Sequence, residues 1–312
     1  MLTDASIPGI PESLRRSYPF RTRFASVEGG RMSFVDEGGA DAPPLLLLHG
    51  NATWSWLYRK VIPKLAERFR VIAPDLVGFG LSDKPSAFGY HTLAQHASNL
   101  TALANALGLT KLTLVASDWG GPIGLSYAAA HPENIQRILL MNTWASVPDA
   151  HFQWELSPGI RSARGGLASL FTNAPLRIVR EGSAKPLSAE SVAGYKFSLA
   201  SKQSRDATRE LARNIPLAVS DPEYQSFQGL HAGLRKIIAP VEILWGTRDP
   251  LFGGKLWPYL LRDAFPSASE PEFLDNAGRL VPEDAPDRVI DKLLEIFKPK
   301  PAIAKPALNI LK

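Results

Sequence analysis

The chain has 312 residues, of which 45% are apolar and 21% are charged, so it is too apolar for a disordered protein and long enough to bury a full core. It contains no cysteine, which excludes disulfides, thiolate metal ligands and a cysteine nucleophile. The net charge is +5, but four lysines of the last fifteen residues supply most of it (Lys298, Lys300, Lys305 and Lys312). The rest is close to neutral, which argues against nucleic-acid binding.

The sequence also lacks the features of a membrane span and of an export signal. The longest uncharged run, 85–110, contains His, Gln, Ser and Asn side chains that a bilayer core would disfavour, so we expect no membrane span. The first sixteen residues, MLTDASIPGIPESLRR, lack the apolar core of an export signal, and together with the lack of cysteine this favours the cytoplasm. Neither a metal cluster nor a phosphate loop nor a dinucleotide fingerprint is recognisable, so we expect no cofactor.

The first half of the chain alternates between strand and helix patterns. An antiparallel hairpin over 18–38 is followed by continuous apolar runs typical of strands buried on both faces, with helical spacing between them. The predicted strands are 43–50, 69–75, 111–117 and 136–143, and the predicted helices are 54–68, 92–107 (with Thr92 as N-cap) and 120–131. This order predicts an α/β protein with a mostly parallel, doubly wound sheet.

The alternation stops over 146–228, which is polar, interrupted by Pro and Gly, and contains helical patches such as 201–213; we interpret it as an inserted helical cap. The alternation then resumes with further predicted elements at 240–246, 254–264, 270–274 and 284–297. We therefore predict a core formed by 1–145 and 229–297, a cap over 146–228, and a loosely held basic Pro/Ala-rich tail over 298–312.

A nucleophile motif lies between the strand 111–117 and the helix 120–131. In the sequence VASDWGG (115–121), the form small-x-nucleophile-x-small fits only one register, with Ala116 and Gly120 as the small flanks and Asp118 at the tip. Ser117 is excluded because Trp119 would then occupy a small position. An aspartate at such a turn can attack a saturated carbon and form an alkyl ester. The alternative is a surface aspartate that caps the following helix.

The motifs together resemble the haloalkane dehalogenase group of the α/β-hydrolase superfamily. The resemblance covers residues from about 18 to 296. It rests on VDEG (35–38), HGNATWSWLYR (49–59), IAPDLVGFGLSDKP (72–85), SDWGGPIGLSYAAAHPENI (117–135) and LWGTRDPLF (244–252). It implies an α/β-hydrolase fold and an aspartate nucleophile, with Asp118 in a strained turn that faces a pocket between sheet and cap.

The resemblance implies three more site residues. Asn51 and Trp119 would donate side-chain N–H groups to a departing halide, as neutral donors aimed at a developing anion. Asp249 would be the acid of the triad, because MNTW (141–144), where some dehalogenases carry that acid, has no carboxylate. The alternatives are a turn-forming role for Asn51 and simple packing for Trp119. His49 and Asp83 are expected to be structural.

The chain departs from the family at the catalytic base. The family carries a histidine in a late segment resembling AGHxxxEDAP, whereas this chain reads AGRLVPEDAP (277–286), with Arg279 at that position. The six histidines all precede Asp249 (49, 91, 96, 131, 151 and 231), and of these His151 lies in the predicted cap. Arginine stays protonated and cannot act as a base. We expect Arg279 to pair with Asp249 in a bidentate ion pair or to stabilise an anion.

Three functions remain open at this point. The first is a dehalogenase-type hydrolase whose hydrolytic step is impaired or altered. The second is a relative of the β-lactone decarboxylases of olefin biosynthesis, which the cap sequence 185–224 also resembles. The third is a non-enzymatic or crippled member that binds an apolar ligand. The expected ligand is accordingly a small apolar or halogenated molecule or a β-lactone, and the oligomeric state is left open.

Overall fold

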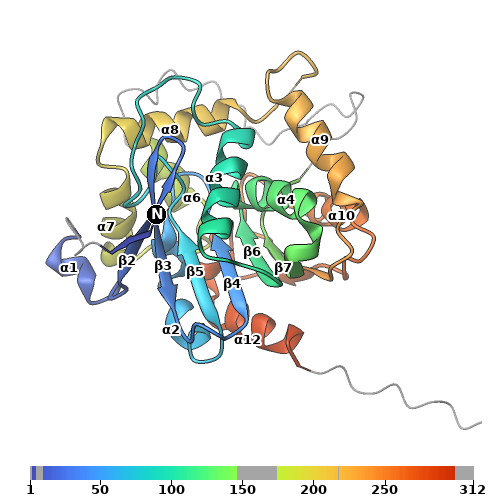
Figure 1. Ribbon diagram of the computed structural model, residues 1–312, viewed down its shortest axis with the longest axis horizontal. Helices are drawn as coiled ribbons and strands as arrows, with labels where there is room; N and C mark the ends of the chain where they lie inside the picture. The colour runs from blue at the N-terminus through green and yellow to red at the C-terminus, as the bar shows by residue number, and fades with distance from the viewer. Residues whose placement is uncertain (1, 5–9, 146–173, 217, 299–312) are drawn as a thin grey trace, which may run out of the picture.

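A computed structural model describes residues 2–4, 10–145, 174–216 and 218–298 (Figure 1). The first part of the predicted cap, including His151, lies outside the described residues, and so does the predicted tail beyond Lys298. No helix among the described residues is long and apolar enough to cross a bilayer.

The core of the molecule is a sheet of nine strands in the order β1-β2-β3-β5-β4-β6-β7-β8-β9. The first three strands are antiparallel, and β5, β4, β6, β7, β8 and β9 run parallel to one another. The strands are β1 (Leu2–Asp4), β2 (Thr22–Val27), β3 (Gly30–Glu37), β4 (Pro44–Leu48), β5 (Arg70–Pro74), β6 (Leu112–Ser117), β7 (Ile135–Met141), β8 (Val241–Gly246) and β9 (Glu272–Leu274).

The apolar run of β4 shows why the central strands lie where they do. Leu46 and Leu48 belong to the core cluster on one face of the sheet, whereas Leu45 and Leu47 belong to the cluster on the other face. All four are fully buried. A strand with apolar side chains at every position must be covered on both faces, so it lies in the middle of the sheet.

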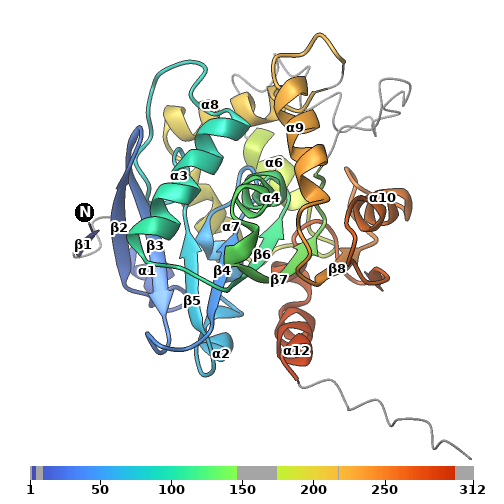
Figure 2. The ribbon, with the colours of Figure 1, turned by 45° about the vertical axis from the view of Figure 1, so that its right-hand side comes forward.

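Helices cover both faces of the sheet. Those on one face include α3 (Leu93–Ala106), α4 (Gly120–Ala130), α9 (Tyr224–Leu234) and α10 (Leu256–Ala264), of which α3, α4 and α9 stand in front in Figure 2. The other face is covered by α2 (Ile62–Leu65) and α12 (Pro286–Ile296). The predicted α/β fold with a mostly parallel, doubly wound sheet is confirmed. The remaining helices are α1 (Glu12–Arg15), η1 (Ser55–Tyr58), η2 (Pro132–Asn134), α6 (Ala174–Glu181), α7 (Ala189–Ser198), α8 (Lys202–Arg213) and α11 (Val281–Asp284).

One predicted element is wrong. The helix expected over 54–68 is instead a short 3₁₀ turn, η1, and a single helical turn, α2. Pro63 lies at the start of α2, where its ring and missing N–H prevent an α-helix from continuing out of the preceding turn. The Trp56 carbonyl accepts hydrogen bonds from the backbone and the guanidinium of Arg59, which closes η1 as a 3₁₀ turn.

The helices α7 and α8, which lie in the segment predicted as a cap, contact the loops after β4 and β5, and α8 lies at the top of the molecule in Figure 1. The Trp54 indole N–H donates to the Gly194 carbonyl at 3.0 Å, and the Gly80 amide donates to the Ser198 hydroxyl at 2.8 Å. The predicted boundary after residue 228 falls inside α9, which packs against α4 of the core.

A buried ion-pair network also joins core and cap. The Arg59 guanidinium binds the Glu283 carboxylate through two hydrogen bonds of 2.6 and 3.0 Å, and Lys60 lies 2.7 Å away. Tyr195 and Ser191 of α7 donate to the same carboxylate at 2.9 and 3.0 Å. Burial opposes ionisation of Glu283, but the hydrogen bonds and charges of Arg59 and Lys60 outweigh it and lower its pKa to about 2.

Replacing Glu283 with Gln should therefore destabilise the protein by about 3–5 kcal/mol at neutral pH, because Arg59 is left buried without its counter-ion. The folded-state pKa lies below the ordinary value of 4.5, so this stability is present above pH 4.5 and is lost as the pH falls towards 2. Urea unfolding of wild type and E283Q at pH 7 and at pH 3 measures the difference. The exposed Glu67→Gln is the control and should change stability by less than about 0.5 kcal/mol. If the stability difference between wild type and E283Q is the same at both pH values, the pH-dependent stability does not come from ionised Glu283.

Candidate active site

The turn between β6 and α4 holds Asp118 in a strained conformation. Its φ is +50°, in the left-handed region that side chains other than glycine rarely adopt. Neighbouring backbone and side chains hold it there: the Asp118 amide donates to the Asn142 carbonyl at 3.0 Å, and its own carbonyl accepts the Thr143 hydroxyl at 2.5 Å. The two groups that fix the turn thus come from the end of the adjacent strand, β7.

Two glycines allow the chain to approach this turn. A Cβ on Gly50, directly after β4, would lie 2.2 Å from the Asp118 Cβ, and a Cβ on Gly120 would lie 2.4 Å from the Leu48 carbonyl oxygen. Neither contact can be relieved by a flexible side chain. The small residue that the motif requires at position 120 is therefore needed so that the helix can start directly against β4.

The Asp118 side chain is buried, and each of its two carboxylate oxygens has a contact. Its Oδ1 accepts the backbone N–H groups of Asn51 at 2.9 Å and Trp119 at 2.6 Å. Its Oδ2 lies 3.4 Å from Nε of Arg279. The arrangement orients the carboxylate and leaves Oδ2 as the atom without a backbone donor.

Arg279 is 3% exposed, and its guanidinium connects the core to the cap. Besides its ion pair with Asp118, its Nη2 donates to the Ile178 carbonyl of α6 at 2.7 Å. The predicted bidentate pair with Asp249 is wrong, because the ion pair is with Asp118 and Asp249 is satisfied by other donors. Arg279 is nevertheless in the site, beside the candidate nucleophile.

Asp249 lies after β8 and is fully enclosed. Its Oδ1 accepts the Leu251 amide at 2.8 Å, and its Oδ2 accepts the Asn142 side-chain amide at 2.9 Å. Burial raises the pKa of Asp249, and the positive charge of Arg279 opposes that rise.

Asn142 is a site residue that the motif reading missed. Its side chain donates to Asp249 and to the Gly246 carbonyl and accepts the Gly246 amide, while its own carbonyl accepts the Asp118 amide. Asn142 therefore links the two aspartates. The segment MNTW (141–144) has no carboxylate, but an asparagine at this position was the signal in the sequence that could have identified a site residue.

The two predicted halide donors differ in their surroundings. The Asn51 side chain is engaged, because its Nδ2 donates to the Thr208 carbonyl of α8 at 2.9 Å and its Oδ1 accepts the Ala52 amide at 2.8 Å. The Trp119 indole N–H is buried and has no hydrogen-bond partner among the described residues, and the same is true of Trp144, whose ring packs edge-on against Trp119 at 5.3 Å. A buried donor without an acceptor is free to bind an anion.

The described histidines do not replace the missing base. None of them forms a hydrogen bond with Asp118 or Asp249. His49 accepts the Leu76 amide at 2.9 Å through Nε2, and burial lowers its pKa, so it holds the loop after β5 as a neutral ring. Asp83 pairs with Arg31 on the hairpin. Among the residues described, no group of three His, Asp or Glu side chains is placed to hold a metal ion.

The chain is similar to known proteins of the α/β-hydrolase fold family. The model of the family described as the alpha/beta hydrolase fold matches residues 43–286. Haloalkane dehalogenase 2 of Mycobacterium bovis is 34% identical over 281 residues, which are 90% of this chain and 96% of that protein. The cis-3-alkyl-4-alkyloxetan-2-one decarboxylase of Shewanella oneidensis is 34% identical over 283 residues, covering 87% of this chain and 86% of its own. The tetrameric haloalkane dehalogenase of Paraglaciecola agarilytica superposes with a TM-score of 0.80 at 25% identity, over 92% of this chain and 96% of its own.

The chain therefore belongs to the α/β-hydrolase fold family. Within that family it is a haloalkane dehalogenase-like enzyme, with a β-lactone decarboxylase among its relatives. The resemblance read from the motifs is confirmed, whereas the role of each site residue is still a matter of proposal.

Replacing Arg279 with Gln should raise the pKa of Asp249 further, because it removes the charge that opposes the effect of burial. A carboxyl whose pKa is raised on folding holds its proton more tightly in the folded state, so stability falls as pH rises from the ordinary value of 3.8 through the raised value. R279Q should therefore be destabilised more at pH 7 than at pH 4, and the loss at pH 7, about 3–5 kcal/mol, includes the cost of leaving Asp118 buried without its ion-pair partner. Urea unfolding at the two pH values measures this.

The double variant D249N/R279Q is the matched control, since it removes the carboxyl that titrates. The part of the difference between pH 7 and pH 4 that comes from Asp249 should disappear in it, whereas the loss caused by the unpaired Asp118 should remain. A pH dependence that persists unchanged without Asp249 would refute the assignment.

Proposed function

We propose that Asp118 is the nucleophile of a dehalogenase-type reaction at a saturated carbon. The observation that carries this proposal is the geometry of its carboxylate: Oδ1 is held by two backbone N–H groups, and Oδ2 has no backbone donor. In the reaction Oδ2 forms a bond to the carbon while the carbon–halogen bond breaks, and the halide departs with the bonding electrons. The product is an alkyl ester on Asp118.

The departing halide needs donors in a site without water. The indole N–H of Trp119 supports this role, because it is buried and has no acceptor in the part of the chain that the structure describes. We assign Asn51 as the second donor, through the N–H of its side chain that is not directed to Thr208. Both donors are neutral, so they can stabilise a halide without forming an ion pair with Asp118.

Completion of the cycle requires hydrolysis of the ester, for which a base must activate water. Arg279 cannot take a proton from water, because a guanidinium stays charged. In the proposed scheme alkylation proceeds, because it needs only an ionised Asp118 and the halide donors, whereas hydrolysis is slow. When the enzyme is incubated with an alkyl halide, the ester on Asp118 therefore accumulates.

Incubation with 1-bromobutane should accordingly release about one bromide per protein and leave a stable butyl adduct, because the second step lacks its base. Halide release and intact-protein mass spectrometry measure the two events. Asp118→Asn should abolish both, and the exposed Asp41→Asn should change neither. Sustained turnover by the natural chain would contradict the scheme and would point to another base, with His151 the first residue to replace.

Replacing Arg279 with His should convert this single burst into turnover. An imidazole at that position can accept a proton from water, and supplying a general base typically accelerates such a step by about 10²–10⁴-fold. The rate of bromide release after the burst measures it, with the exposed Arg248→His as the control that should stay a single burst. If R279H alkylates but still does not turn over, position 279 is not the place from which a base acts.

One observation favours a second candidate, a β-lactone decarboxylase-like lyase: the Arg279 guanidinium lies beside Asp118 in a buried site. Attack of Asp118 on the ring carbon that bears the lactone oxygen breaks that bond and frees a carboxylate, which Arg279 would neutralise. Loss of CO₂ then leaves its bonding electrons to form a C=C bond as the ester bond to Asp118 breaks. This route restores Asp118 without water or a base.

A cis-3,4-dialkyl β-lactone separates the two candidates. Alkene and CO₂ in many turnovers, with only a single halide burst from 1-bromobutane, would favour the lyase. An inert lactone together with a halide burst would favour the dehalogenase. Absence of any product or adduct with both compounds would count against both and leave a ligand-binding role.

A further inference from the structure

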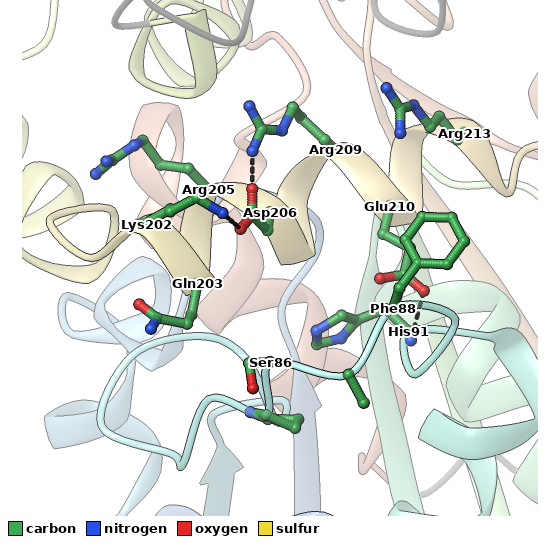
Figure 3. A pocket seen from close by; sticks show the side chains of 12 residues that line it. Ser86, Phe88, His91, Lys202, Gln203, Arg205, Asp206, Arg209, Glu210 and Arg213 are labelled. Atoms are coloured by element: carbon green, nitrogen blue, oxygen red, sulfur yellow. Dashed lines mark hydrogen bonds and ion pairs between the residues drawn. The ribbon is translucent and has the colours of Figure 1, made fainter.

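A groove of about 650 Å³ lies on the outer side of the cap, between the loop 85–88 and helix α8 (Figure 3). Its volume is in the range of sites that hold small organic molecules. It is separate from the Asp118 site, because the buried face of α8 supplies the Thr208 carbonyl to Asn51. The groove is lined by other side chains of the same helix.

Four cations run along the groove side of α8: Lys202, Arg205, Arg209 and Arg213. Their spacings of three, four and four residues place them on one stripe of the helix, about 16 Å long at 1.5 Å per residue. Figure 3 shows them following the helix above the loop that carries Phe88.

The carboxylates of the groove do not balance these charges. Asp206 pairs with both Lys202 and Arg209. Glu210 is directed to the loop, where it accepts the His91 amide at 3.1 Å.

The other two arginines have no carboxylate partner among the described residues. Arg205 donates to the carbonyls of Leu199 and Ala200 at the end of α7. Arg213 forms no ion pair with the described residues, although its charge acts on Glu210 and opposes the rise of the Glu210 pKa caused by burial. Burial and then the charges of Arg213 and Arg205 lower the pKa of Arg209, as expected where cations repel one another. The groove therefore has an excess of positive charge.

The opposite wall is apolar. Pro85, Ala87 and Phe88 line it, and the Phe88 side chain is 90% exposed, the largest exposure among the large apolar residues described. An aromatic ring in water is less favourable than a buried one. A ligand with a hydrocarbon body would cover the ring and so gain binding energy. Cations on one wall and an exposed ring on the other match an amphiphilic anion.

We propose that this groove binds an organic carboxylate, with its charged end on Arg213 and on Arg209, whose ion pair with Asp206 uses only Nη2, and its hydrocarbon body against Phe88. Guanidinium groups bind carboxylates through charge-assisted and often bidentate hydrogen bonds. The site takes its ligand from solution, and it is independent of the reaction at Asp118.

Isothermal titration with octanoate, octan-1-ol and acetate tests both halves of the site. Octanoate should bind at least about tenfold more tightly than octanol, which lacks the charge, and than acetate, which lacks the body. Its affinity should fall as salt is added. Equal binding of octanoate and octanol would overturn the proposal, as would equal binding of octanoate and acetate.

Variants locate the binding. R209Q/R213Q should weaken octanoate binding at least about tenfold, and Phe88→Ser should weaken octanoate but not acetate. The control R235Q/K236Q removes the same charge from an exposed site outside the groove and should bind octanoate as wild type does. Thermal unfolding identifies any variant that is not folded.

Octanoate could also enter the catalytic site beside Arg279, and R279Q distinguishes the two places. Binding that is lost in R279Q and kept in R209Q/R213Q would place octanoate beside Asp118 and overturn the groove site. Binding kept in R279Q and lost in R209Q/R213Q supports it.

Discussion

The carboxylate of Asp118, held at the tip of a left-handed turn, is the constraint on which the rest of the site depends. The turn can form only where the neighbouring strands provide partners, so the ends of β4, β6 and β7 meet at one point. Gly50 lets β4 approach the Asp118 side chain, and Asn142 and Thr143 bind its backbone. The buried guanidinium of Arg279 then joins this point to α6, whose Ile178 carbonyl helps to hold the positive charge beside Asp118.

The site contains two buried carboxylates and one buried guanidinium. Arg279 lies against Asp118, whereas Asp249 depends on neutral donors, the amide of Leu251 and the side chain of Asn142. Neutral donors compensate the charge of a carboxylate less than an ion does, which is why burial raises the pKa of Asp249 despite the nearby arginine. An imidazole between the two aspartates could take a proton from water while a carboxylate oriented the ring, whereas a guanidinium there cannot take a proton. The same charge suits chemistry in which an anion forms and stays in the site, as in the opening of a lactone.

Most of the core elements were predictable because each depends on a local pattern. The four leucines of β4 require burial on both faces, and Thr92 caps α3 by accepting the Gln95 amide at 3.1 Å. The failure over 54–68 has a different cause. Its apolar residues suit a helix, but Trp54 and Trp56 are anchored by packing from several directions, and Pro63 interrupts the backbone bonding. The partner of Arg279 was likewise not predictable, because the choice between Asp118 and Asp249 depends on how the chain turns after β8.

The sequence by itself determined the order of strands and helices, the position of Asp118 between a buried strand and a helix, and the absence of a histidine after Asp249, because these follow from residue type and spacing along the chain. The tertiary structure alone decided which side chains meet: Arg279 with Asp118, Asn142 with Asp249, and Asn51 with the Thr208 carbonyl of the cap. Such contacts join residues more than a hundred positions apart, and a shift of about 1 Å in a strand end or a change of rotamer reassigns them. Hydrogen bonds and buried ion pairs weaken steeply with distance and angle, so pattern along the chain carries no information about which of them form.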